Sequence, residues 1–146
     1  MLPTKMQAAV LHGHGDLNQL RIHDDWPTPT AKPGEVLVRV GAAGINNTDI
    51  NTRIGWYSKT VTGATEGAAI DSDEAGGWAG ALHFPRIQGA DVCGEIVAVG
   101  DGVSTSRMGE RVLIRTIIPG DSDDKSQLRT FGSEWDGGFA DFTRCN

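Results

Sequence analysis

Short polar side chains crowd one stretch of the chain, residues 44–55, directly after a segment with the pattern of a β-strand. Side-chain amides and hydroxyls donate hydrogen bonds of the kind that orient a substrate and polarise its carbonyl or enone oxygen. The same residue types also favour helix caps and turns for purely local reasons. The stretch is therefore either a functional site or a capped turn, and we interpret it as a functional site. Five such residues fall within six positions: Asn46, Asn47, Thr48, Asp49 and Asn51.

The overall composition is that of an ordinary globular domain. Of the 146 residues, 38% are hydrophobic and 22% are charged, which suffices for one core. The formal net charge of -6 argues against a nucleic-acid partner, because such binding relies on lysine and arginine. No apolar run approaches the roughly 20 residues that a membrane-spanning helix needs, and the N-terminal segment lacks the layout of a signal peptide. We expect a cytoplasmic location, with no membrane and no nucleic-acid partner.

The cysteines and histidines show no spacing typical of a metal site. Cys93 and Cys145 lie far apart in the sequence, and we expect both to be small buried hydrophobes. His12 and His14 flank a glycine in a turn-rich segment; metal binding there is an alternative, but turn histidines are usually solvated. We therefore predict solvated histidines and no bound metal.

Hydrophobic alternation predicts the first strands. Residues 6–11 and 20–23 are predicted to be strands joined as a hairpin across a glycine-rich turn. The clearest strand covers residues 35–40, where valines at every second position share one face.

A short helix is predicted to follow that third strand. Asn46 or Asn47 can cap a helix that begins at Thr48. Ile50 and Ile54, four residues apart, would then face the core.

The second half of the chain predicts further short strands. Residues 92–99 are rich in β-branched side chains but include Gly94, where the strand bends or another backbone lies close. Residues 110–118 and 138–143 are also predicted to be extended. Residues 60–80 are rich in glycine and acids and predict a surface loop that can serve as a lid. Many short strands with one or two short helices indicate a mainly β fold, a barrel or a sandwich.

Several motifs, in their order and spacing, resemble the GroES-like catalytic domain of the medium-chain dehydrogenase/reductase superfamily, which includes alcohol dehydrogenases and quinone reductases. Each motif alone is weak, and their succession is specific. The resemblance implies a mainly β (α+β), partly open GroES-like barrel across residues 1–146. The motifs are Pro-Gly-Glu-Val-Leu-Val-Arg-Val at 33–40, Gly-Ile-Asn at 44–46 with Asp49 and Arg53, Pro-Arg-Ile-Gln-Gly-Ala-Asp-Val-Cys-Gly at 85–94, Val-Ala-Val-Gly at 97–100, Gly-Glu-Arg-Val at 109–112 and Gly-Gly-Phe-Ala-Asp-Phe at 137–142.

The residues that hold zinc in metal-dependent members of this superfamily are replaced here. Those members carry a cysteine at the position of Asn46 and Gly-His-Glu where residues 89–91 read Gly-Ala-Asp. An asparagine amide and an alanine methyl do not replace a thiolate and an imidazole as zinc ligands. The segment corresponding to the structural-zinc lobe, residues 118–135, contains no cysteine. The resemblance therefore implies a zinc-independent member.

The resemblance also implies catalytic and cofactor-binding roles. Zinc-free quinone reductases carry an asparagine at the position of Asn46, beside the nicotinamide or the substrate. Thr48 matches the hydroxyl residue that relays a proton in alcohol dehydrogenases, although the histidine of that relay is replaced by Asn51. We therefore expect Thr48 to orient the substrate or the cofactor through hydrogen bonds and not to complete that relay. We assign Asn46 and Thr48 as catalytic residues, and Asn46, Asn47 and Thr48 as cofactor-binding residues.

Substrate binding is assigned to three residues at and after the end of the predicted helix. Asn51 stands where quinone reductases commonly have a tyrosine, which weakens the case for a quinone substrate. Trp56 and Tyr57 follow the helix and are placed to form a pocket wall, although core packing is an alternative for each.

The implied reaction is hydride transfer between NADP or NAD and a small carbonyl, enone or quinone compound, with the cofactor supplying the reactivity. No Gly-x-Gly-x-x-Gly fingerprint occurs in the chain, so the Rossmann domain that binds the cofactor is expected after residue 146. We expect the chain to be the substrate half of a longer, homodimeric enzyme and to be inactive alone. The alternative is a non-enzymatic GroES-like barrel used for interaction or assembly.

Overall fold

In its described part, the chain folds into short strands and one α-helix. The computed structural model describes residues 1–57, 82–119 and 128–146, so the predicted loop over residues 60–80 lies outside the described residues. The helix α1 covers Asn47–Arg53, and the 3-10 turns η1 and η2 cover Leu17–Gln19 and Thr105–Arg107. The strands are β1 (Lys5–Leu11), β2 (Leu20–Pro27), β3 (Val36–Gly44), β4 (Arg86–Ile87), β5 (Asp91–Val99), β6 (Arg111–Ile114), β7 (Ile117–Pro119), β8 (Leu128–Thr130) and β9 (Phe142–Cys145).

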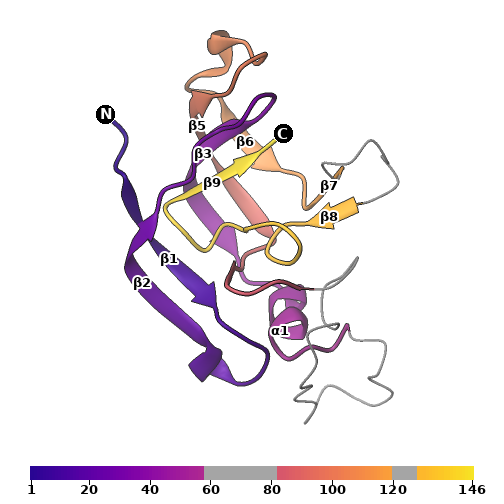
Figure 1. Cartoon of the computed structure of the whole chain (residues 1–146). Coiled ribbons are helices and arrows are strands. Elements are labelled where there is room, and N and C mark those ends of the chain that lie inside the picture. The colour runs from indigo at the N-terminus through magenta and orange to yellow at the C-terminus, as the bar shows by residue number, and fades with distance from the viewer. Residues whose placement is uncertain (58–81, 120–127) are drawn as a thin grey trace.

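The strands form three antiparallel sheets within the described residues (Figure 1). The central sheet has the order β6-β5-β3-β9, the second has the order β2-β1-β4, and β7 pairs with β8. An isolated bridge between Ala8 and Ala140 connects the second sheet to the segment before β9. This arrangement confirms the predicted mainly β fold with one or two short helices.

The predicted strands are found, but several bounds differ: β2 runs on to Pro27 and β3 to Gly44, beyond the predicted ends at residues 23 and 40. The hairpin is confirmed, since β1 pairs with β2 from Leu11–Leu20 outward. The single strand predicted over residues 110–118 is two strands, because β6 pairs with β5 whereas β7 pairs with β8. Thr116, between them, accepts a hydrogen bond from the N–H of Phe131 at 2.9 Å instead of continuing the ladder of β6. The strand predicted over residues 138–143 begins only at Phe142.

Strand β3 lies between two hydrophobic clusters. Val36 and Val38, on the face that the alternating valines share, are buried in a cluster with residues of β5, Phe131 and Trp135. Leu37, on the opposite face, is buried with Met6 and other residues of the second sheet. Both faces of β3 are therefore covered over its first three residues, whereas Arg39 and Gly41 further along the strand are exposed. The end of this strand leads directly into α1.

Gly94 confirms the predicted close approach of two backbones. A Cβ atom at this position would lie 2.1 Å from the carbonyl oxygen of Arg39 on β3. The register of β3 against β5 shifts between Val40 and Ala42, opposite this glycine. Glycine therefore permits the bulge that bends the central sheet.

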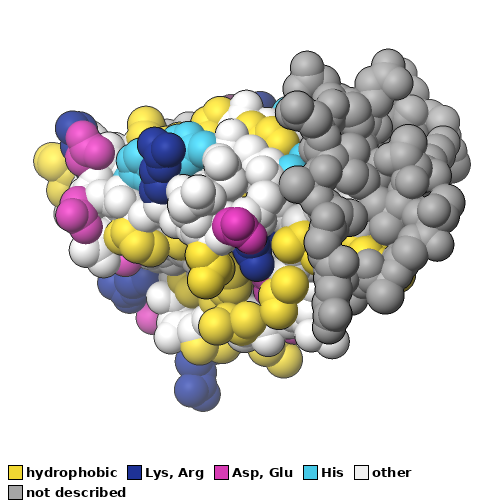
Figure 2. Space-filling model, turned by 90° about the horizontal axis from the view of Figure 1, so that it is seen from below, with side chains coloured by type: hydrophobic (Ala, Val, Ile, Leu, Met, Phe, Trp, Pro, Cys, Tyr) yellow, Lys and Arg dark blue, Asp and Glu magenta, His cyan; other side chains and the backbone are white. Residues whose placement is uncertain are grey.

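The prediction of solvated histidines is correct only in part for His12 and His14, which are partly buried and have hydrogen-bond partners. The antiparallel pairing of β1 and β2 brings His12 Nε2 to 2.9 Å from His23 Nε2. Seen from below, the surface of the molecule shows a patch of histidine side chains (Figure 2). His14 Nδ1 donates to the carbonyl oxygen of Thr52 at 3.0 Å. His12 has its partner because β1 pairs with β2, and His14 has its partner because α1 lies beside it. The amino-acid composition of the turn does not reveal either contact.

We expect the His12–His23 contact to weaken in mild acid. Burial, followed by the charges of Arg21 and His23, lowers the pKa of His12 below its ordinary 6.5. The folded chain therefore binds fewer protons than the unfolded chain below pH 6.5, and stability is lost as the pH falls from 6.5 toward the lowered pKa. Urea unfolding of wild type and His12→Gln at neutral pH and at about pH 5 measures this. The wild type should lose more stability than the variant, and equal losses would contradict the assignment.

The cysteines are both free thiols. Cys145 is buried as predicted, and burial raises the pKa of its thiol. Cys93 is only partly buried, so the prediction that it is buried is wrong. No helix among residues 1–57, 82–119 and 128–146 has the length and apolar composition needed to cross a membrane.

Candidate functional site

The helix α1 begins at Asn47 and is capped by Asn46 at the end of the central sheet (Figure 1). The side-chain oxygen of Asn46 accepts from the N–H of Thr48 at 3.3 Å. Asp49 Oδ2 in turn accepts from the N–H of Asn46 at 2.8 Å. This reciprocal capping box satisfies two backbone donors that the first turn leaves unpaired. The polar stretch is thus a capped turn, and the contacts below show that it also borders a cavity.

Asp49 fixes the helix to the segment that precedes β5. Its Oδ1 accepts from the N–H of Gly89 at 3.0 Å, and its carbonyl oxygen accepts from Gln88 Nε2 at 2.8 Å. Asp49 is 5% exposed and Gln88 is 1% exposed. Burial raises the pKa of Asp49, while the N–H groups of Asn46, Gly89 and Ala90 act in the opposite direction. The start of α1 and residues 88–90 therefore form one rigid unit.

The prediction that Ile50 faces the core is wrong. Its side chain is 44% exposed, whereas the helix buries Asp49 and Thr52. The reason is that the neighbouring segment presents backbone N–H groups, which need acceptors, and not an apolar surface. Ile54, at the end of the helix, is partly buried.

A cavity of about 320 Å³ lies at the first turn of α1. Its wall combines three parts of the chain that are distant in sequence: the helix region, the start of β5 and the β7–β8 pair. Four of the predicted site residues line it, whereas Asn51 and Trp56 do not. The lining residues are Asn46, Asn47, Thr48, Tyr57, Ala90, Asp91, Thr116, Ile117 and Thr130.

Tyr57 connects Asn51 to Thr48. The Tyr57 hydroxyl donates to Thr48 Oγ1 at 3.2 Å, and Asn51 Nδ2 donates to the Tyr57 oxygen at 3.4 Å. Trp56 is 38% exposed and contacts the Tyr57 ring edge to face, with ring centroids 5.7 Å apart. Asn51 and Trp56 are therefore neighbours of Tyr57, while the hydroxyls of Tyr57 and Thr48 border the cavity.

Asp91 and Thr116 complete the opposite wall, and sequence reasoning missed this arrangement. Asn46 Nδ2 donates to Asp91 Oδ2 at 2.9 Å, and Thr116 Oγ1 donates to Asp91 Oδ1 at 3.4 Å. Asn46 uses its oxygen for the helix cap and one amide hydrogen for Asp91, so its second amide hydrogen remains for a ligand. No local pattern marks Thr116, because its contact with Asp91 spans 25 positions.

The donor set at this cavity does not suit zinc. Among the described residues that line it, the one carboxylate is that of Asp91, whose oxygens already accept from Asn46 and Thr116. Tetrahedral zinc sites use three or four thiolate, imidazole or carboxylate ligands. Across the described ranges, no three histidine, cysteine or acidic side chains are grouped so that they could hold a metal ion.

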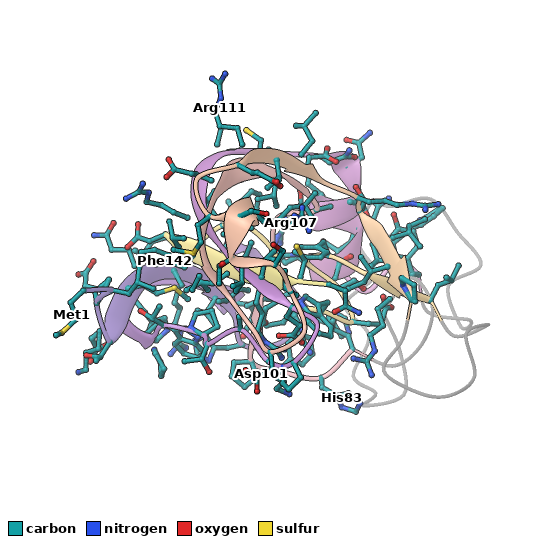
Figure 3. The ribbon with its side chains drawn as sticks, turned by 90° about the horizontal axis from the view of Figure 1, so that it is seen from above. Met1, His83, Asp101, Arg107, Arg111 and Phe142 are labelled. Carbon is teal, nitrogen blue, oxygen red and sulfur yellow. The ribbon has the colours of Figure 1, made fainter. Side chains whose placement is uncertain are left out.

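A larger hollow of about 650 Å³ lies elsewhere, on the outer face of β3, β5 and β6. Its lining includes Cys93, Arg111 and Leu113, and none of the predicted site residues. Arg111, on the edge strand β6, points away from the body of the molecule (Figure 3). The smaller cavity at α1 is the better candidate because polar side chains converge on it.

Comparisons with known proteins identify the family of the chain. The alcohol dehydrogenase GroES-like domain family matches residues 32–146. The NAD(P)H oxidoreductase RTN4IP1, mitochondrial, of Danio rerio is 34% identical over 110 residues, which cover 75% of this chain and 27% of that protein. The human quinone oxidoreductase is 29% identical over 115 residues, covering 79% of this chain and 29% of that protein.

A solved structure extends the match to nearly the whole chain. A candidate alcohol dehydrogenase from Sinorhizobium meliloti 1021 is 38% identical with a TM-score of 0.78, covering 99% of this chain and 38% of that one. The chain thus spans well under half the length of these relatives. The family match covers most of the chain, and the relatives are medium-chain alcohol and quinone oxidoreductases. The chain therefore belongs to the alcohol dehydrogenase GroES-like domain family of the medium-chain dehydrogenase/reductase superfamily.

Proposed function

We propose that this chain is the substrate-binding half of an NAD(P)-dependent oxidoreductase that transfers hydride to or from a carbonyl, enone or quinone compound. The observation that carries the proposal is the cavity at α1, where the Thr48 hydroxyl and the Asn46 amide border a space large enough for a small molecule. Relatives named NAD(P)H oxidoreductase and quinone oxidoreductase support it.

We propose that the polar wall of the cavity faces the nicotinamide ring and the small substrate. The side chains of Asn46, Asn47 and Thr48 offer amide and hydroxyl groups that suit the carboxamide of a nicotinamide ring. NADP or NAD, when bound, supplies or accepts the hydride. We propose that a separate Rossmann domain holds most of the dinucleotide, since the relatives are much longer than this chain.

In the proposed reaction, the Thr48 hydroxyl polarises the substrate oxygen. Thr48 accepts a hydrogen bond from Tyr57 and therefore has its own proton to donate into the cavity. The second amide hydrogen of Asn46 can bind the same oxygen, and its orientation is fixed by Asp91. Two preorganised donors replace a metal as the group that stabilises negative charge on this oxygen.

We also propose that the reaction needs no zinc, on the basis of the donor set. Asn46 and Ala90 stand at two positions where zinc-dependent members supply a thiolate and an imidazole, and Asp91 is engaged by hydrogen bonds. Metal analysis of the purified full-length protein, with turnover measured before and after chelation, tests this. Stoichiometric zinc together with loss of turnover on chelation would overturn it.

Replacing Thr48 with valine, which keeps the shape and removes the hydroxyl, should lower kcat of the full-length enzyme about 100-fold, as loss of a donor to the reacting oxygen typically does. The assay uses NADPH or NADH with benzaldehyde, cyclohexenone and benzoquinone as probes. Thr48→Ser, which retains the hydroxyl, should recover most of the turnover. Unchanged turnover of the valine variant would remove Thr48 from the site.

The alternative, a non-enzymatic barrel used for interaction or assembly, is favoured if the full-length protein oxidises neither cofactor with any of these probes. A homodimer and a cytoplasmic location remain proposals as well. Sedimentation of the full-length protein tests the homodimer. Cell fractionation tests the location, and it is needed because the Danio rerio relative is named mitochondrial.

A further inference from the structure

A hydrogen-bond chain with one direction leads through Tyr57 to the cavity. Asn51 Nδ2 lies 3.4 Å from the Tyr57 oxygen, and the Tyr57 hydroxyl lies 3.2 Å from Thr48 Oγ1. An amide NH2 group only donates, so the Tyr57 oxygen is the acceptor in the first bond and its proton is used in the second. Thr48 then accepts from Tyr57 and presents its own proton to the cavity that it lines.

The end of α1 places Tyr57 in this chain. Gly55 has φ of +72°, and its N–H bonds to the carbonyl of Thr52 at 3.2 Å, while the N–H of Trp56 bonds to the carbonyl of Asn51 at 2.9 Å. These two bonds form a Schellman motif, which ends the helix and reverses the chain. Tyr57 is thereby brought back beside Thr48 and Asn51, which lie three positions apart on one side of the helix.

We propose that Tyr57 supplies the proton that Thr48 passes to the substrate oxygen. This inference rests on the proposed function and assigns the proton source of that reaction. In this scheme Tyr57 acts on the substrate only through Thr48. It is therefore a positioning residue, and it also carries the proton that Thr48 receives. The amide of Asn51 stabilises the negative charge that remains on the Tyr57 oxygen.

The proton balance of carbonyl reduction is complete with these groups. The carbonyl carbon gains the hydride from the reduced nicotinamide, and the C=O π bond breaks. The oxygen takes the Thr48 proton as an O–H bond forms, and Thr48 takes the proton of Tyr57, which becomes a phenolate. Tyr57 is only partly buried, so water can return its proton. Alcohol oxidation runs through the same steps in reverse.

Turnover of the full-length enzyme with the most active of the three probes tests the step. Tyr57→Phe should lower kcat about 100-fold with little change in KM, since loss of a proton donor affects the transition state more than binding. The double variant Thr48→Val/Tyr57→Phe should be no slower than Thr48→Val alone, because the two residues act in series. The solvent deuterium isotope effect on kcat should change in Tyr57→Phe. Ile50→Ala, at an exposed site of the same helix, is the matched control and should behave as wild type.

A second measurement does not depend on activity. Tyr57 is the single tyrosine of the chain, so tyrosine labelled with ¹³C at Cζ gives one resonance from it. Asn51→Ala and Thr48→Val should each shift this resonance, whereas Ile50→Ala should not.

The outcomes separate this inference from the proposed function. If the wild-type enzyme turns over a probe but Tyr57→Phe matches it, or the two variants are additive, or neither variant shifts the resonance, the proton route is wrong and the proposed function stands. If no probe is turned over with either cofactor, the proposed function fails and the route fails with it.

Discussion

Asp49→Ala is expected to lower the free energy of unfolding by about 3 kcal/mol and to abolish the organised site. The change leaves the buried N–H of Gly89 and the N–H of Asn46 without acceptors, at roughly 1–3 kcal/mol for a fully buried donor. Burial of the carboxylate is itself unfavourable, as the raised pKa of Asp49 indicates. Removing the carboxylate relieves this cost. We expect the lost hydrogen bonds to dominate, because Asp49 joins two separate backbone segments. Urea unfolding monitored by tryptophan fluorescence measures the effect.

Two further variants make this prediction specific. Asp49→Asn keeps the volume and one acceptor oxygen but turns an NH2 group toward a backbone donor, so we expect a loss of about 2 kcal/mol. Asp141→Asn is the matched control, since Asp141 accepts a single backbone N–H, that of Gln7 at 2.8 Å, at an exposed site. It should cost less than about 1 kcal/mol. If all three variants lose the same stability, Asp49 has no special anchoring role.

Features set by near neighbours in the chain were predictable. The capping box needs only Asn46 and Asp49, three positions apart, and the alternation of β3 marks its own face. Gly94 gave a correct signal because glycine weakens the interior of a strand and is therefore uncommon there unless a bend or a close backbone requires it. Helix caps, strand periodicity and glycine positions all act within a few residues, so the sequence displays them directly.

Features set by distant pairing were not predictable. The bond from Gly89 to Asp49 spans 40 positions, and it decides that α1 buries its polar side and exposes Ile50. The 110–118 segment splits because its two ends pair with different strands, which its own composition does not show. His12 finds His23 through the hairpin register in the same way.

The candidate site likewise has parts that the sequence predicts and parts that depend on distant pairing. Asn46, Asn47, Thr48 and Tyr57 were predicted and do share a cavity, although their roles remain predictions. The contact of Tyr57 with Thr48 spans nine positions and depends on the chain reversal at Gly55, which a C-terminal glycine rule would have indicated. Thr116 and Thr130, by contrast, reach the cavity through a pair of strands that no local pattern assigns to the site.

Gly137→Ala should destabilise the chain by about 3 kcal/mol, since overpacking against backbone cannot be relieved by a rotamer change. A Cβ at Gly137 would lie 2.3 Å from the carbonyl oxygen of Gly89 and 2.6 Å from that of Gln88. The N–H of Gly137 also bonds to the carbonyl of Ile87 at 2.8 Å, so the two segments cannot separate without losing this bond. Any shift of residues 87–89 moves the partners of Asp49.

Gly137→Ala should therefore change the candidate site as well as the stability of the fold. Two measurements on this variant distinguish the two effects. Urea unfolding gives the stability, and the Tyr57 Cζ resonance reports whether the helix region has moved. Gly41→Ala is the matched control, because a Cβ there would meet its nearest atom at an ordinary 3.7 Å. It should change stability by no more than about 0.5 kcal/mol. If Gly137→Ala is as stable as Gly41→Ala, residues 87–89 can yield without cost. The conclusion that α1 and residues 88–90 form a rigid unit, and that the wall of the cavity is fixed, would then be wrong.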